Sequence, residues 1–245
     1  MCPLFSPTIT TPRMIHLERP IDMYSSDELE FLSLRLEGAE VGWKTDDKCP
    51  SRVREVATTK TRDPQSRRLL EGGRWLLTAS DTSSVVYFDL DASPITENVL
   101  IPDQHDPTPN VFMCTQMAID VDGNSAFLAF NLALSLCSPD TVTNLMQYII
   151  QVWNVVLLRD AQQRGIGLAA ELLSSFPQEP LISGIYSISL CGPHTALSGF
   201  SSHSTHFIWG LVLDWVQANG DTTDCRPRMF HLTDAGAVST IPPNI

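Results

Sequence analysis

Apolar and polar residues follow two different periods along the chain, and the change falls near residue 51. Before it, Leu29, Leu32, Leu36 and Ala39 recur at intervals of three and four, which places them on one helical face. After it, short apolar runs of β type alternate with turn residues. The pattern therefore predicts one amphipathic helix followed by a mostly β region.

The predicted helix has a start signal and an end signal. Ser25 and Glu28 have the Ser-x-x-Glu spacing of a capping box, in which each side chain bonds a backbone amide of the other residue. Gly42 lies near the expected end, and Trp43 just beyond it is an apolar anchor. We expect a helix over about residues 26–40 that docks by its leucine stripe on the protein's own core. A partner-binding helix is the alternative.

Eight runs have the composition of strands. They cover residues 75–80, 85–90, 118–120, 125–136, 147–158, 184–191, 206–217 and 229–232. Asp122 and Gly123 predict a two-residue hairpin turn, because both types accept the positive φ angles such a turn requires. Residues 168–176 fit a helix as well as a strand, and the pattern alone leaves that choice open.

Three strand candidates end in a similar way, with an aromatic residue beside a polar one that can hydrogen-bond. These ends lie around Asp89, Asn154 and Asp214. They are similar to the Trp-Asp ending of WD-type propeller blades, but their spacing of about 60 to 65 residues exceeds the ~40 to 45 of regular WD repeats. Long loops at residues 101–110 and 138–144 would account for the difference, so periodicity permits a propeller without establishing one.

Composition narrows the possible partners. With 245 residues, of which 43% are hydrophobic, the chain can bury a core without disulfide staples. A formal net charge of -12 weighs against nucleic acid, because phosphate binding needs a basic surface. One basic cluster exists, made of Arg52, Arg54, Lys60, Arg62, Arg67 and Arg68. It is more typical of a solvated segment than of a docking site for an acidic protein.

The sequence predicts an intracellular protein, in the cytoplasm or the nucleus. Its longest apolar stretch, residues 148–158, is interrupted by Gln151 and Asn154, so no membrane-spanning helix is expected. Residues 1–14 lack the parts of a secretory signal. The six cysteines, at positions 2, 49, 114, 137, 191 and 225, never form a Cys-x-x-Cys pair. Reduced thiols and no zinc site are expected.

Histidines and serines offer the first candidates for catalysis. His203 and His206 are three apart, a spacing that points strand side chains to opposite faces, and no third metal ligand accompanies them. His194 follows a Gly-Pro turn, and residues 198–202 lack the strand–turn–helix context of a hydrolase nucleophile. A small hydrolase remains a rival hypothesis. It would require one of these three histidines to reach a Ser or Asp.

The remaining candidates have structural explanations of their own. Gly165 and Gly167 form a bare Gly-x-Gly without a phosphate-binding lysine. Asp120 and Asp122 flank a turn, where aspartate is favoured for its local hydrogen bonds. We therefore assign no catalytic, cofactor-binding or metal-binding residue, expect no cofactor, and leave the partner-binding residues unassigned.

Several blocks, in order along the chain, resemble one protein family. They are residues 29–37 with Trp43, the block Leu-Leu-Glu-Gly-Gly-Arg-Trp-Leu-Leu at 69–77, and residues 87–91, 127–136, 150–155, 173–176, 190–194 and 214–219. Together they resemble the region after the F-box in F-box proteins of mushroom-forming fungi, over about residues 24–233. The resemblance implies a propeller-like, non-enzymatic receptor that holds a target for a cullin–RING ubiquitin ligase. It also favours a strand at residues 168–176.

We therefore expect an all-β fold, with incomplete WD-like β-propeller blades preceded by one amphipathic helix. Residues 1–23 would be a flexible arm, 24–50 the helix and a linker, and 51–245 the partial propeller. The F-box finds no match in residues 1–24, and the roughly 195 residues after the helix are fewer than the ~300 of seven blades. Docking to the ligase through a Skp-type linker is therefore an open question.

The expected function is protein binding, as the target-recognition part of an F-box-type substrate receptor. A structural subunit without a ubiquitin role is the alternative from another class. An incomplete propeller would leave strands such as residues 229–232 unpaired at a sheet edge, and unpaired edges favour self-association. Proteins, including a second copy of this chain, are therefore the expected partners, with no nucleic acid and no membrane.

Overall fold

The computed structural model describes most of the predicted β region. The described residues are 17–44, 56, 66–70, 72–80, 84–103, 113–123, 125–139, 146–178, 182–201, 204–216, 228–232 and 238–241. Outside them lie most of the expected N-terminal arm, most of the basic cluster, His203 and the cysteines at positions 2, 49 and 225.

The predicted helix is present and is longer than expected. A short 3-10 turn, η1 (Ile21–Met23), precedes α1 (Ser26–Lys44). The capping box forms: the Ser25 N–H donates to Glu28 Oε2 at 2.8 Å, and the Glu28 N–H donates to Ser25 Oγ at 3.3 Å. The expected end at about residue 40 is four residues short, because α1 continues through Gly42 to Lys44. A glycine inside a helix costs only about 1 kcal/mol relative to alanine, too little to end it.

Helix α1 contacts the sheets less closely than its leucine stripe predicts. Leu29, Leu32 and Leu36 are half-buried, and no residue between 26 and 37 is fully buried. Phe31 and Leu34 are 63% and 60% exposed. The stripe therefore faces the protein without entering its core, which corrects the expected docking. Within the described residues, no helix combines the length and apolar character that crossing a membrane requires.

The strands form three antiparallel sheets whose strand order follows the chain. The first sheet holds β1 (Ser66–Leu69), β2 (Trp75–Ala79), β3 (Val85–Asp89) and β4 (Glu97–Ile101). The second holds β5 (Met113–Val121), β6 (Ala129–Pro139), β7 (Met146–Arg159) and β8 (Gly165–Gln178). The third holds β9 (Ile182–Cys191), β10 (His194–Ser201), β11 (Ser204–Asp214), β12 (Arg228–Leu232) and β13 (Val238–Ile241). The described chain is thus mostly β, in three meanders, and none of the sheets closes on itself.

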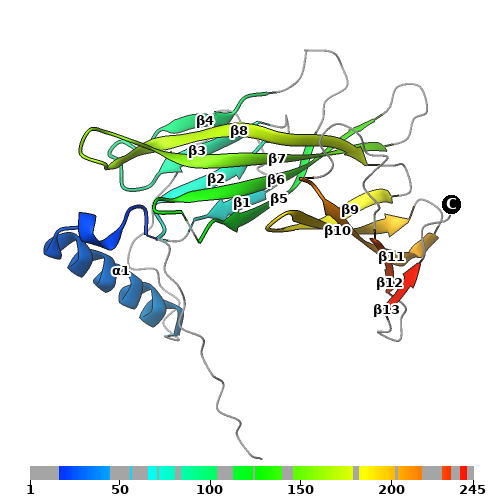
Figure 1. Cartoon of the computed structure of the whole chain (residues 1–245), viewed down its shortest axis with the longest axis horizontal. Helices are drawn as coiled ribbons and strands as arrows, with labels where there is room; N and C mark the ends of the chain where they lie inside the picture. Colours follow the sequence, from blue (N-terminus) through cyan, green and yellow to red (C-terminus); the bar gives the residue numbers. More distant parts are fainter. Residues whose placement is uncertain are drawn as a thin grey trace, which may run out of the picture.

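The second sheet lies between the other two and is buried on both faces at its centre. On β6, Leu132 and Leu134 belong to the core shared with the first sheet, whereas Ala133 and Cys137 belong to the core shared with the third. A strand buried on both faces has an almost continuous apolar sequence, as this one has. Figure 1 shows this arrangement, with α1 across one end of the stacked first and second sheets and the third sheet at the other end.

The structure confirms the predicted strands, including the one for which the residue pattern was ambiguous. Residues 168–176 lie inside β8, which pairs along its length with β7. Leu168 and Phe176 are buried, and Leu172 and Leu173 are 43% and 36% exposed. The spacing that fitted a helical face therefore arises from a strand whose register shifts near Val152 of β7.

The predicted two-residue turn at Asp122 and Gly123 is wrong. Seven residues connect β5 to β6, because β6 begins only at Ala129. The Asp122 N–H donates to the Ala129 carbonyl at 2.9 Å and closes this longer loop. Leu128 is buried, and its N–H donates to the carbonyl of Glu18 at 3.2 Å. The carbonyl of Glu18 in the N-terminal segment thus accepts a backbone N–H that would pair with the neighbouring strand in a tight hairpin.

The expected unpaired edge at Met229–Leu232 is also wrong. These residues lie in β12, which pairs with β11 on one side and with β13 on the other. Strand β13 has the sequence Val-Ser-Thr-Ile, in which apolar and polar residues do not alternate, so the pattern does not mark it as a strand. The edge strands of the third sheet are β9 and β13.

The structure gives Gly167 a packing role. A Cβ atom at this position of β8 would lie 2.7 Å from the hydroxyl oxygen of Tyr87 on β3. Tyr87 is buried, and its ring packs edge-on against Trp75 with a centroid separation of 5.8 Å, so it has little room to move. We expect Gly167→Ala to lower the free energy of unfolding by about 2 kcal/mol through overpacking. Urea unfolding followed by circular dichroism measures this loss.

The control removes the atom that the new methyl group would meet. In a Tyr87→Phe background the hydroxyl is absent, so Gly167→Ala should cost less than half as much as in the natural chain. An equal cost in both backgrounds would show that the contact with Tyr87 is not what requires glycine here.

Candidate functional site: the α1 cleft

An open cleft lies between α1 and the turns at the nearby end of the first two sheets. We call it the α1 cleft, and its volume is about 470 Å³. Its lining is Leu17, Glu18, Arg19, Tyr24, Asp27, Glu28, Phe31, Leu32, Arg35, Leu36, Gly72, Arg74, Asp91, Arg164 and Gly165. Its size is that of a typical small-ligand or side-chain pocket, and apolar and charged groups alternate around it.

The Gly-Gly-Arg-Trp part of the sequence forms one wall of the cleft. Gly72 and Gly73 have φ angles of 83° and 70°, which residues with a side chain rarely adopt, and they turn the chain from β1 into β2. The carbonyl of Gly73 accepts a hydrogen bond from Arg35 of α1 at 2.9 Å. The two glycines thus place Arg74 and Trp75 at the end of the sheet that faces the helix.

Arg74 joins three separate parts of the chain. Its Nε and Nη2 atoms donate to the two carboxylate oxygens of Asp89 at 3.0 and 2.7 Å. Its Nη1 donates to Glu18 at 2.9 Å, and Nη2 also donates to the Gly165 carbonyl at 2.8 Å. Because bidentate pairing with a carboxylate fixes a guanidinium in position, Arg74 is a structural junction between the first sheet, the second sheet and the N-terminal segment.

The network shifts the pKa values of its members. Burial alone would raise the pKa of Asp89, but hydrogen bonds from Arg74 and from the Asp91 amide more than offset it and hold that pKa below its ordinary value. Burial likewise would lower the pKa of Arg74, and the Asp89 and Glu18 carboxylates raise it instead. Both groups are therefore ionised at neutral pH and occupied with each other.

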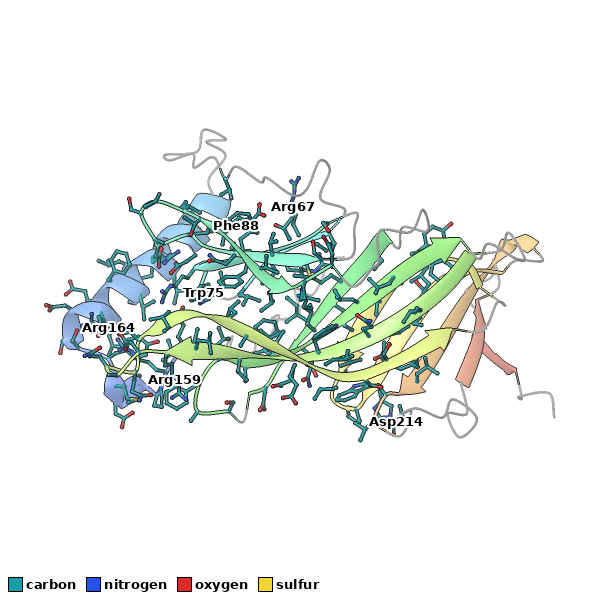
Figure 2. All side chains as sticks on the ribbon, turned by 90° about the horizontal axis from the view of Figure 1, so that it is seen from above. Arg67, Trp75, Phe88, Arg159, Arg164 and Asp214 are labelled. Atoms are coloured by element: carbon teal, nitrogen blue, oxygen red, sulfur yellow. The ribbon has the colours of Figure 1, made fainter. Side chains whose placement is uncertain are left out.

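Trp75 connects this network to the core. Only 1% of its side chain is exposed, and its Nε1–H donates to Glu18 Oε1 at 2.8 Å. The guanidinium of Arg74 lies 4.4 Å from the indole ring, within the range of a cation–π contact. Figure 2 shows Trp75 between the helix and the interior of the two sheets.

Two ion pairs attach α1 and the segment before it. Arg35 reaches Asp91 at 3.0 Å, and Arg19 reaches Glu28 at 2.6 Å. The backbone N–H of Ser25 and the Arg19 guanidinium lower the pKa of Glu28, whose side chain is 46% exposed. Arg19 also lies 4.2 Å from the Tyr24 ring, whose burial raises the pKa of its hydroxyl. Because α1 is held mainly by these polar contacts, the apolar groups between them stay accessible from the cleft.

An aspartate with the same local hydrogen bond lies at the end of the third strand of each sheet, as the last residue of β3 and β11 and as the first residue after β7. Asp89, Asp160 and Asp214 each accept the N–H of the residue two positions ahead, at 3.0, 2.9 and 3.1 Å. This bond is an Asx-turn, which ends a strand in an ordered way. The sequence had identified Asp89 and Asp214, but placed the third such end at Asn154, which lies inside β7 opposite Asn131.

The candidates for catalysis are not brought together in the described residues. His194 is exposed at the first position of β10, opposite Asp214. Ser187 and Ser198 share a hydrogen bond of 2.7 Å with each other. His206 lies in β11 without a described side chain, and His203 lies outside the described residues. Among the histidines, the structure describes the side chain of His194, and it forms no hydrogen bond with a serine among the described residues.

The other candidates have contacts that explain them. Asp120 accepts the backbone N–H of Gly192 at 2.6 Å and so links the second and third sheets. Gly165 gives its carbonyl to Arg74, and Gly167 makes room for Tyr87. Of the thiols with described side chains, Cys137 is buried and Cys191 is exposed, and neither forms a disulfide. None of these residues lines the α1 cleft except Gly165.

Sequence analysis missed Glu18, Arg19 and Arg164 as site residues. Glu18 and Arg19 precede the capping box in a segment that was expected to be a flexible arm. Arg164 belongs to the β7–β8 turn, where a single arginine carries no pattern. The only available signal was the density of charged residues near Pro20, which does not distinguish a solvated segment from a network.

Comparisons with known proteins add no family assignment. A scan against protein-family models, a search of curated proteins and a search of solved structures found no match for this chain.

Proposed function

We propose that this chain is a non-enzymatic protein-interaction module, and that it serves as the target-recognition part of an F-box-type ubiquitin-ligase substrate receptor. The first half of this proposal is carried by one observation, the exposed apolar side chains on α1 and just before it, of which Phe31 also lines the α1 cleft. Phe31 and Leu34 are more than half exposed on α1, and Ile21 and Met23 just before it are 64% and 40% exposed. Phe31 and Leu34 are three positions apart on α1 and therefore neighbours on the helix surface, and adjacent exposed apolar side chains are typical of protein-binding surfaces.

The second half of the proposal rests on the sequence resemblance. The Gly-Gly-Arg-Trp block, which is the most specific part of the likeness, forms the wall of the cleft through Gly72 and Arg74. The receptor hypothesis therefore assigns target binding to a surface that this block helps to build.

We extend the proposal to the architecture: the three meanders are successive blades of an incomplete propeller. Three observations support it. Each meander follows chain order, β1 lies beside β5, and β5 lies beside β9, as the inner strands of neighbouring blades would. The first and third sheets also share one hydrogen bond at the end of the third strand. In the first sheet, the N–H of the residue after Asp89 donates to the carbonyl of Arg74, just before β2. In the third sheet, the N–H of the residue after Asp214 donates to the carbonyl of Pro193, just before β10.

The test of function is affinity purification of the tagged chain from the cells that produce it, with mass spectrometry of the proteins that accompany it. We expect a Skp-type linker and a cullin, together with target proteins. Phe31→Ala/Leu34→Ala should lose the targets, because the side chains that contact them are shortened while the helix is kept. Both positions are exposed, so we expect the stability to change by less than about 0.5 kcal/mol.

Leu69→Ala is the matched control, since Leu69 is 60% exposed, as Leu34 is, but lies on β1 and belongs neither to α1 nor to the lining of the cleft. It should retain every partner. Targets that bind all three forms equally would contradict the cleft as the binding surface. Recovery of targets without ligase components would favour a structural subunit over a substrate receptor.

A further inference from the structure

One arginine of the α1 cleft differs from the other three. Arg19, Arg35 and Arg74 each form an ion pair with a carboxylate at 3.0 Å or less. The guanidinium of Arg164, which also lines the cleft, takes part in no hydrogen bond or ion pair with the described residues. Figure 2 places Arg164 at the tip of the second sheet beside α1. The cleft therefore contains one available positive charge.

The backbone of Arg164 is held in place although its side chain is unpaired. Its N–H donates to Asp160 Oδ1 at 2.8 Å, and its carbonyl accepts the Asp160 N–H at 3.0 Å. Gln163 before it has a φ of 62°, and its N–H donates to the Asp160 carbonyl. Because these bonds already order the backbone, binding of a ligand to the guanidinium would cost side-chain entropy but little further backbone entropy.

Apolar groups lie in the same cleft as this charge. Tyr24, Phe31, Leu32 and Leu36 line it, and Phe31 is 63% exposed. A ligand that places an apolar side chain against these groups would bury area now in water, and would partly desolvate any ion pair formed with Arg164. Partial desolvation strengthens such a pair relative to one in open solvent.

Acidic groups limit where an anionic group can be placed. Asp27 lines the cleft at the start of α1 and would repel a carboxylate there, next to Glu28, which is paired with Arg19, and the chain as a whole carries a net charge of -12. A strongly acidic partner is therefore disfavoured by long-range repulsion. A segment with a single carboxylate, placed at the Arg164 end, avoids this repulsion.

We infer that the α1 cleft binds a protein segment in which an apolar side chain lies close to one carboxylate, with the apolar group against Phe31 and Leu32 and the carboxylate on Arg164. This inference rests on the proposed protein-binding function and names the chemistry of the partner. Because exposed apolar side chains continue along α1 to Leu34, outside the cleft, the surface suits an extended segment rather than a small molecule.

The test uses the full chain and a displayed library of short random peptides. Peptides selected on the natural chain should carry Phe, Leu or another apolar residue at a fixed spacing from Asp or Glu. Arg164→Gln should weaken these peptides about fivefold, the effect of removing one charged partner from a partly exposed pair. Arg68→Gln, at an exposed arginine of β1 outside the cleft, is the matched control and should leave the affinity unchanged.

A second measurement ties the effect to the carboxylate. Changing the acidic residue of a selected peptide to its amide should cost the natural chain the same fivefold, and should cost Arg164→Gln nothing further. Selected peptides without an acidic preference, or equal losses in Arg164→Gln and Arg68→Gln, would overturn the inference. If the selected peptides lack the acidic preference but still lose affinity for Phe31→Ala, the proposed protein-binding function stands and only the inference on Arg164 is overturned. If the peptides bind Phe31→Ala as tightly as the natural chain, or if no peptide is selected, both the inference and the proposed function are overturned.

Discussion

Replacing Trp75 by alanine is expected to lower the free energy of unfolding by about 4 kcal/mol. The side chain is 1% exposed, and truncating a buried tryptophan removes both its transfer free energy and the contacts that lined it. The substitution also removes the Nε1–H that donates to Glu18. Because a domain of this size is stabilised by only about 5 to 15 kcal/mol, a loss of this size should move the urea midpoint far below that of the natural chain.

Trp75→Phe and Val99→Ala make the measurement specific. Trp75→Phe keeps most of the apolar volume but not the donor to Glu18, so we expect an intermediate loss of about 2 kcal/mol. Val99 of β4 is 46% exposed, and its truncation should cost less than about 0.5 kcal/mol. Far-UV circular dichroism is the suitable signal, because it does not depend on the tryptophan that is removed. A loss in Trp75→Ala no larger than in Val99→Ala would show that this residue does not anchor the core.

The predictable part of the fold is the part that local pattern determines. The strand around Trp75 and the strand that ends at Asp89 were both expected within one residue of their observed bounds, because alternation and turn residues mark them. The helix start was expected correctly because the capping box at Ser25 is a local signal. These features depend on residues a few positions apart.

The errors concern contacts between segments far apart in the chain. Arg74 bonds Glu18, which is 56 residues away, and Gly165, which is 91 residues away. No period or spacing in the sequence links those positions, so the block around Arg74 was recognised as distinctive whereas its partners were not identified. The loop after Asp122 was mistaken for a tight turn for the same reason, because Glu18 binds the backbone of Leu128.

The cleft was hidden by a physical ambiguity in the helix pattern. A stripe such as Leu29, Leu32 and Leu36 predicts that a helix face is covered, but it does not say how closely. In the structure the polar contacts of Arg35 and Glu28 decide the position of α1, and the stripe remains half-buried above a cleft. The distance between the helix and the sheets depends on contacts of single charged residues with distant segments, and the leucine stripe carries no information about these contacts.

The last prediction concerns the Arg74 network and its dependence on pH. Arg74→Met keeps the length and apolar stem of the side chain but removes the guanidinium. Asp89 and Glu18 would then lose their main partner, with side chains 19% and 26% exposed. Removing one member of such a partly buried pair leaves a carboxylate poorly solvated, and we expect a loss of about 3 kcal/mol in the free energy of unfolding at pH 7.

The loss should become smaller as the pH falls. In the natural chain the pKa of Asp89 lies below its ordinary value, so its contribution is present above the unfolded pKa of about 4 and disappears as the pH falls through the lower folded value. In Arg74→Met, burial is no longer opposed by the guanidinium, and the pKa of Asp89 should rise above the unfolded value. The variant then gains stability relative to the natural chain between about pH 7 and pH 4, because its Asp89 can bind a proton.

Urea unfolding of both forms at pH 7 and about pH 4 measures this convergence, and Arg68→Met is the control, since Arg68 of β1 is exposed. Its difference from the natural chain should be near zero at both values. Adding Asp89→Asn to Arg74→Met should restore part of the loss at pH 7, because the unpaired charge is removed. A gap for Arg74→Met that is the same at both pH values would mean that Arg74 stabilises the fold through contacts other than its ion pair with Asp89, such as the hydrogen bond to the Gly165 carbonyl.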